Sequence, residues 1–100
     1  MNHASDSTFT KWLAETEAKS PPPPNGYSFK IGERVRHKTS RRENGRELTA
    51  RVIGRGSAFK PNTGEFSREL AYLEIEDPSP VMEPINAVLA EYWEVAPNDR

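Results

Sequence analysis

Hydrophobic and polar residues alternate along most of the chain after residue 28, which is the period expected of β-strands. The pattern covers residues 29–38, 48–54, 70–76 and 92–96, and segment 85–91 is long enough for one helical turn. No helix long enough for a crossover between parallel strands is predicted, so the sheet should be antiparallel. The pattern predicts an all-β domain: a small SH3-like barrel of about five antiparallel strands, with a short helical turn near the C-terminus.

The segments between these strands contain turn-forming residues. Segment 55–66 contains Gly, Pro and Asn, segment 77–84 contains three prolines, and both are predicted as loops. Apolar residues on one face of the strands form the predicted core, which consists of Val35, Leu48, Val52, Leu73, Ile75, Leu89, Trp93 and Val95.

Four consecutive prolines at 21–24, followed by Asn25-Gly26, mark a boundary. Such a stretch favours an extended polyproline II spacer and does not pack into a core. We therefore predict a flexible N-terminal tail at 1–19, a Pro-rich linker at 20–28, the barrel at 29–96 and a C-terminal end at 97–100.

The predicted tail contains one helical pattern. Phe9, Trp12 and Leu13 have the spacing that gathers side chains on one face of a helical turn, and Asp6 or Ser7 is a suitable N-cap. A helix of about ten residues is marginal in water unless it docks on another surface. The three apolar residues are therefore candidate anchors for a partner's groove. The alternative is a frayed tail that touches its own barrel loosely.

Composition limits the class of protein to which the chain can belong and the kinds of site that it can carry. The chain has no cysteine, which excludes disulfides and thiolate metal sites and favours a reducing compartment. It has neither a signal-peptide pattern nor an apolar run long enough to cross a bilayer, so we predict a cytoplasmic protein without a membrane partner. The two histidines, His3 and His37, do not form a metal-ligand pattern, and no catalytic constellation is recognisable.

The net charge of −1 conceals a division along the chain. Residues 30–68 contain eleven Lys and Arg against four acids, whereas residues 69–100 contain eight acids and one Arg. In an antiparallel barrel the two halves interleave, so many of these charges can pair across strands. A separate basic face is the alternative.

Two stretches resemble the plasmid-borne type II dihydrofolate reductases, a family unrelated to the chromosomal enzyme. In "FKIGERVRHK", Phe29 is followed by a Gly-acid-Arg-Val-Arg strand that ends at Lys38, and "VIG" at 52–54 is similar to the family's second strand. Pro84, Ala87 and Leu89 are similar to its closing proline and alanine-leucine turn. The resemblance covers about residues 29–95 and implies a barrel preceded by a disordered tail. The Gly-acid-x-Val opening is also shared by many SH3-like domains.

In that family a Val-Gln-Ile-Tyr-Pro segment lines the central pore of a symmetric tetramer, where NADPH and folate meet. Alignment on Pro84 places Val81, Met82 and Glu83 at the positions of the glutamine, isoleucine and tyrosine. Valine lacks the hydrogen-bonding groups of a glutamine amide, and clustered Glu83 carboxylates would repel a phosphate-rich cofactor and an anionic folate. Lys38 matches the lysine at the pore mouth. The resemblance thus implies either a reductase with an altered pore or a relative without that activity.

Nucleic acid is another candidate partner. Arg34, Arg36, Lys38, Arg41, Arg42 and Arg46 lie on the first strand and the loop after it, where they can form a basic rim. Phe59, Phe66 and Tyr72 are available for stacking on bases. The acidic second half of the chain opposes phosphate binding unless the charges separate in space.

The function we predict is a non-catalytic SH3-like binding or self-assembly module, without cofactor or metal. Its partner is another protein or further copies of itself, up to a homotetramer, with Tyr72 and Tyr92 on the self-association surface. The alternatives are an NADPH-dependent type II dihydrofolate reductase and a single-stranded nucleic-acid-binding barrel. The predicted ligand or partner surface consists of Lys38, Arg34, Arg36, Arg41, Arg42, Val81, Met82 and Glu83.

Overall fold

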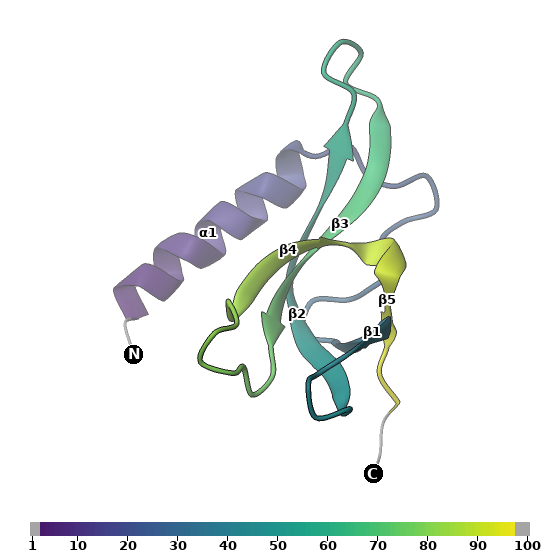
Figure 1. Cartoon of the computed structure of the whole chain (residues 1–100). Coiled ribbons are helices and arrows are strands. Elements are labelled where there is room, and N and C mark those ends of the chain that lie inside the picture. The colour runs from purple at the N-terminus through teal and green to yellow at the C-terminus, as the bar shows by residue number, and fades with distance from the viewer. Residues whose placement is uncertain (1–2, 98–100) are drawn as a thin grey trace.

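The computed structural model describes residues 3–97 of the chain. Its elements are α1 (His3–Lys19), β1 (Arg34–Arg41), β2 (Glu47–Phe59), β3 (Phe66–Ile75), β4 (Ile85–Leu89), the 3-10 turn η1 (Ala90–Tyr92) and β5 (Trp93–Val95) (Figure 1). The strands form one antiparallel sheet in the order β4-β3-β2-β1-β5. This confirms the predicted all-β class, with five antiparallel strands and a helical turn near the C-terminus.

The sheet curls so that its two edge strands, β4 and β5, approach each other. The 3-10 turn η1 joins them directly (Figure 1). Within residues 3–97, β4 and β5 are not hydrogen-bonded neighbours, so backbone pairing does not close the barrel along this seam. The sheet therefore keeps two edges. The edge at β5 has three residues and the edge at β4 has five.

The core lies inside the curl of the sheet. Five of the eight predicted core residues are buried, namely Val35, Val52, Leu73, Ile75 and Trp93. Leu48 and Leu89 are half-buried. The prediction for Val95 is wrong: its side chain is 49% exposed, because it ends a three-residue edge strand with a neighbouring strand on one side only.

Strands β2 and β3 form a longer hairpin than the sequence predicts. The segment 55–66 was expected to be a loop, but pairing continues to Phe59 and Phe66, and only the intervening residues turn. Gly64 has a φ of 73°, a conformation that glycine adopts without strain, and its N–H donates to Lys60 O at 2.8 Å. The first strand is shorter than expected, because it begins at Arg34 and not at residue 29.

Helix α1 packs against β2 on the face of the sheet opposite the core (Figure 1). Leu13 is buried there, and a Cβ atom added at Gly54 would lie 2.6 Å from Leu13 Cδ2. The missing side chain at Gly54 therefore lets the helix approach the strand closely. Trp12 contacts the ring of Tyr72 edge-on, with 5.6 Å between ring centroids.

Polar contacts join both α1 and the segment after it to β2. Arg55 donates through Nη2 to Glu17 Oε2 at 2.8 Å and through Nη1 to the carbonyl of Phe29 at 3.1 Å. Ser57 Oγ donates to the carbonyl of Pro21 at 2.6 Å. These contacts involve both the segment that the sequence pattern assigns to a tail and the segment that it assigns to a linker.

Candidate functional site

Arg34 and Arg36 of β1 are paired with acids from the second half of the chain and from β2. Arg36 lies between two carboxylates: its Nη1 is 2.6 Å from Glu47 Oε2, and its Nε is 2.7 Å from Glu94 Oε2. These two hydrogen bonds raise the pKa of Arg36. Arg34 Nε donates to Glu76 Oε1 at 2.8 Å. Two of the four arginines of the predicted ligand surface are therefore occupied by the protein's own acids.

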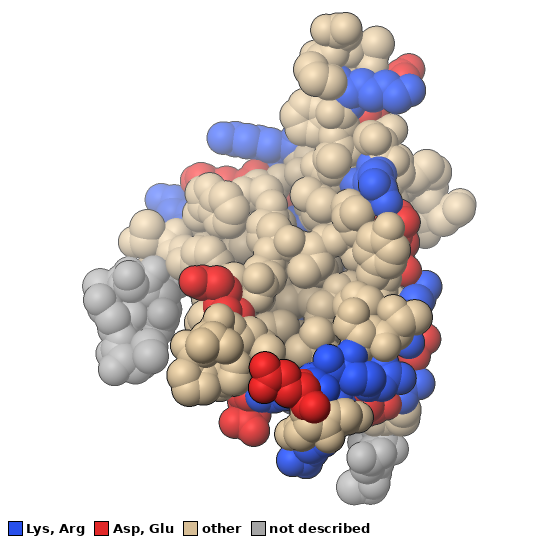
Figure 2. All heavy atoms as spheres, viewed as in Figure 1, with Lys and Arg blue, Asp and Glu red and all other residues tan. Residues whose placement is uncertain are grey.

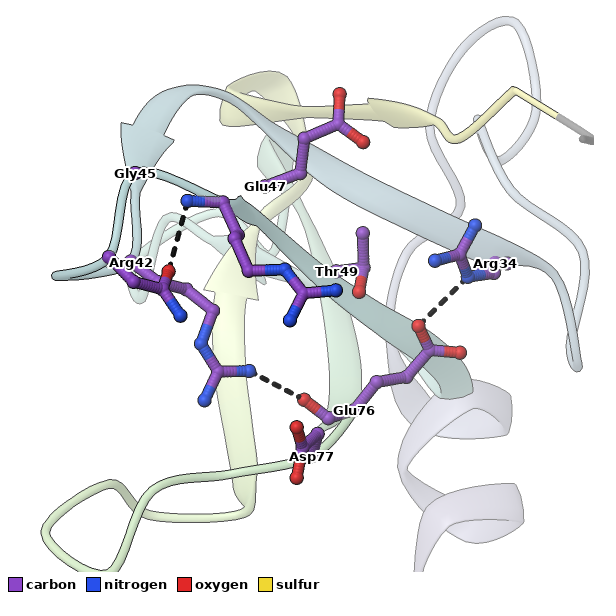
Figure 3. A pocket seen from close by; sticks show the side chains of 9 residues that line it. Arg34, Arg42, Gly45, Glu47, Thr49, Glu76 and Asp77 are labelled. Atoms are coloured by element: carbon purple, nitrogen blue, oxygen red, sulfur yellow. Dashed lines mark hydrogen bonds and ion pairs between the residues drawn. The ribbon is translucent and has the colours of Figure 1, made fainter.

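A hollow of about 550 Å³ opens between the β1–β2 turn and the end of β3 (Figure 3). We call it the arginine hollow. Its walls include Arg34, Arg42, Arg46, Glu47, Glu76 and Asp77.

The turn between β1 and β2 places two arginines at the arginine hollow. Gly45 has a φ of 83°, and its N–H donates to Arg42 O at 2.8 Å. The N–H of Arg42 donates to Arg46 O at 2.9 Å, and the N–H of Arg46 donates to Asn44 Oδ1 at 3.0 Å. This Asn-Gly turn, visible in the sequence as a turn signal, brings both residues to the end of the hairpin.

Arg42 and Arg46 differ from the arginines of β1 in their partners. Arg42 Nη1 donates to the backbone carbonyl of Glu76 at 3.1 Å (Figure 3). Among residues 8–97, no carboxylate lies within ion-pair distance of either guanidinium group. Since Glu47 and Glu76 are held by other arginines, Asp77 is the one carboxylate of the described wall without an ion pair. The arginine hollow therefore offers two guanidinium groups against one carboxylate.

A second hollow, of about 440 Å³, adjoins the first and is lined by Arg42, Asn44, Ser79, Val81 and Met82, together with Glu43. We call it the apolar annex. Val81 is 91% exposed, whereas Met82 is half-buried and packs against the core. Because Arg42 and Asn44 line both hollows, a cationic surface and an apolar surface adjoin at the β1–β2 turn.

Glu76 links the arginine hollow to the sheet. Burial acts to raise the pKa of its carboxyl, but hydrogen bonds from Arg34 and Thr49 and the charges of Arg34 and Arg51 outweigh this effect. The pKa of Glu76 consequently lies below its ordinary value of 4.5. A group whose pKa is lowered on folding stabilises the protein above its unfolded pKa, and this contribution is lost as the pH falls through the folded pKa.

The Glu76→Gln variant should be less stable than the parent near neutral pH, by about 1 kcal/mol, because Arg34 and Arg51 lose a charged partner. The difference should shrink as the pH falls below 4.5, where the carboxyl of Glu76 becomes protonated. Melting temperatures measured across this range test the expectation. Glu74→Gln is the matched control, because Glu74 is an exposed acid of β3 only two residues before Glu76. An equal pH dependence in both variants would contradict the role of Glu76.

The other residues of the predicted ligand surface lie apart from the two hollows. Lys38 is exposed on β1, and Arg41 donates to the carbonyls of His37 and Ser40. Glu83, aligned with the family's pore-lining segment, is exposed in the loop that precedes β4.

The predicted tail anchors lie on α1. Leu13 is buried against Gly54, so its side chain is occupied within the chain itself. Phe9 stacks on Trp12, with 5.9 Å between ring centroids, and Trp12 remains 48% exposed.

Sequence reasoning missed part of the site. It included Arg46 in a basic rim but not in the ligand surface, and it left out Asp77. The Asp-Pro pair at 77–78 is a signal that could have been used, since it ends β3 beside the hairpin. Asp77 has a φ of 50°, a conformation that aspartate tolerates better than most residues.

Among the side chains of residues 8–97, no group of His, Cys, Asp or Glu is arranged to hold a metal ion. No helix of this part of the chain combines the length and apolar character needed to cross a membrane. Comparison of the chain with known protein families, with curated proteins and with solved structures found no match.

Proposed function

We propose that the protein is a non-catalytic binding module that holds an acidic, partly apolar segment of a partner protein at the β1–β2 turn. The observation that carries this proposal is the position of Arg42 and Arg46 at the arginine hollow, where neither guanidinium group has a carboxylate partner among residues 8–97. Arginine donors match the geometry of a carboxylate, and arginine is enriched where interfaces gain most of their energy. The adjoining apolar annex, with Val81 at its edge, offers a place for an apolar side chain.

The wall chemistry favours a protein partner over a nucleic acid. The described residues that line the two hollows include no aromatic side chain, whereas single strands are held largely by stacking on such rings. Asp77 and Glu43 would repel a continuous phosphate backbone. A peptide presents fewer negative charges, and its backbone amides can donate hydrogen bonds to these carboxylates.

The same walls favour binding over catalysis. Among the described lining residues there is neither a histidine nor a cysteine, and the carboxylates of Glu47 and Glu76 accept hydrogen bonds from arginines. The pKa of the Glu76 carboxyl is lowered by its hydrogen bond from Arg34 and by nearby cations, so this carboxylate is a poor proton acceptor.

The proposal is tested with a fluorescein-labelled peptide in which glutamates flank a leucine, by fluorescence anisotropy at low and at physiological salt. Loss of Arg42 or Arg46 to alanine should weaken binding about tenfold each, because a hydrogen bond to a charged group contributes about 1.5–3 kcal/mol. Arg41→Ala is the matched control: Arg41 lies on the same hairpin, is exposed and lines neither hollow. Its loss should leave the affinity nearly unchanged.

Two further probes decide between the partner classes. A peptide with lysines in place of the glutamates should not bind, and replacing leucine by serine should weaken binding through the apolar annex. Tighter binding of an oligothymidylate strand than of the acidic peptide, with equal dependence on Arg41 and Arg42, would overturn the protein-partner proposal in favour of nucleic acid. Equal binding by the parent and the Arg42→Ala, Arg46→Ala double variant would also overturn it.

A further inference from the structure

The edge strand β4 has unpaired backbone groups on its outer side. Ile75 N–H donates to the carbonyl of Pro84 at 2.7 Å, and the register places Asn86 opposite Leu73. In an antiparallel pair, alternate residues turn their N–H and C=O groups toward the neighbouring strand. Asn86 and Val88 therefore bond to β3. Ile85 and Ala87 point their N–H and C=O groups away from β3, toward an edge where no further strand among residues 3–97 pairs with them. Leu89 points its N–H the same way, whereas its carbonyl lies at the N-cap of η1 and accepts the first bond of that turn.

This edge lacks the usual protection against pairing. Natural edge strands are shielded by charged residues, prolines, bulges or short length. The five residues of β4 include neither a charge nor a proline. The other edge, β5, has three residues and carries Glu94. Of the two edges, β4 is therefore the one open to a further strand.

The outer face beside β4 is poor in charge. Ile85, Ala87 and Leu89 lie opposite Glu74, Tyr72 and Leu70 of β3, on the face away from the core. Ile85 is 43% exposed, and Trp12 of α1 continues the apolar surface through its contact with Tyr72. Figure 2, drawn from the same side as Figure 1, shows a broad area without Lys, Arg, Asp or Glu across the middle of the molecule, where β4 and β3 run.

We infer that β4 pairs with β4 of a second copy of this chain, antiparallel and about a twofold axis at Ala87, so that two sheets become one. The sequence of the strand is self-complementary in this register, because Ile85 meets Leu89 of the second copy and Ala87 meets its own equivalent. The two Ala87 residues exchange two hydrogen bonds, and in each Ile85–Leu89 pair the Leu89 N–H donates to the Ile85 carbonyl. The apolar side chains of these pairs lie on one face. This isologous arrangement closes after two copies at this edge, unlike pairing between different strands, which continues into fibres.

The pairing is tested by solution mass and by cross-linking. Sedimentation should show a mass that rises with concentration toward twice the 11.3 kDa of the chain, since an interface built on one short edge strand is small. Ala87 is exposed, and Ala87→Lys places like charges directly opposite each other, so it should weaken association at least about tenfold. Val95→Lys on β5, at a half-exposed apolar residue of the other edge, should leave the mass unchanged.

The absence of cysteine from the chain gives a second, independent readout. In the inferred register the two Ala87 Cα atoms are about 5.5 Å apart, a distance that a disulfide spans. Ala87→Cys should therefore form a covalent dimer under mild oxidation, and Val95→Cys should not. A monomer at all concentrations, or equal cross-linking at both positions, would overturn the inference. A larger assembly supports it only if Ala87→Cys cross-links pairs of chains within it. Capture of an unrelated extended peptide at β4 by a monomeric chain would also overturn it.

Discussion

Replacing Trp93 by alanine should lower the free energy of unfolding by about 3–5 kcal/mol, the largest effect we expect from a single substitution. Trp93 is buried at the start of β5 and meets the ring of His37 edge-on, with 5.1 Å between ring centroids. It is paired with His37 across the β1–β5 ladder, so its loss leaves a cavity where the last strand joins the sheet. Native proteins have a total free energy of unfolding of about 5–15 kcal/mol, so the loss of Trp93 would remove a large part of it.

Urea unfolding followed by far-ultraviolet circular dichroism measures this effect. Trp12→Ala is the control, because Trp12 is 48% exposed and makes ring contacts with Phe9 and Tyr72. It should cost about 1 kcal/mol, the value typical of aromatic pairs. Similar losses for both tryptophans would show that β5 contributes less to the core than its burial indicates.

Strand periodicity predicts the centre of this fold but not its margins. The five core residues confirmed by the structure are large apolar side chains that alternate with polar ones, and this is the signal that periodicity detects. Four other residues of the buried core cluster are absent from the predicted core, namely Phe29, Ala50, Ala71 and Ala90. Three are alanines, whose side chains are too small to stand out in a pattern. Phe29 begins the predicted strand 29–38, but in the structure it is buried in the segment that precedes β1.

The extent of β2 was underestimated for a different reason. The sequence pattern predicts that the strand ends at Gly54 and that a loop containing Gly56 follows, and glycine usually weakens a strand interior. In the structure both glycines lie within β2, under α1, where a Cβ atom would meet Leu13 or Ser20. Both glycines are explained by the packing of α1, a helix that is distant in the sequence. The residue pattern of the strand alone does not reveal that contact.

The division of charge along the chain predicts ion pairs between the basic and the acidic segment, but it does not predict which arginines remain outside these pairs. Bonds such as Arg34 to Glu76, Arg36 to Glu94 and Arg68 to Glu91 join the basic segment to the acidic one, as interleaved strands allow. Composition does not identify which arginines lack a carboxylate partner among residues 8–97. The turn at Gly45 decides this in part, because it directs Arg42 and Arg46 to the arginine hollow. The acids there, Glu47 and Glu76, are already paired with arginines of the strands.

Leu13→Ala should lower the free energy of unfolding by about 2–3 kcal/mol, near the lower end of the range for buried leucines, because Leu13 packs between a helix and a strand. Thermal or urea unfolding measures the loss. A double-mutant cycle with Gly54→Ala identifies its cause. The methyl group of alanine at 54 would lie 2.6 Å from Leu13 Cδ2, so Gly54→Ala alone should cost about 1–3 kcal/mol through overpacking.

In the Leu13→Ala background the clash at 54 disappears. Gly54→Ala should then be neutral or stabilising by about 0.5–1 kcal/mol, since alanine restricts the unfolded chain more than glycine does. Gly56→Ala is the matched control: its nearest contact is Ser20 Oγ at 3.3 Å, so its effect should add to that of Leu13→Ala without coupling. A Gly54→Ala cost that is the same in both backgrounds, together with a small effect of Leu13→Ala, would mean that α1 does not pack on β2 in solution. A coupling of about 1 kcal/mol or more would make α1 part of the cooperative fold, because two residues 41 positions apart exchange energy only when the helix lies on the strand.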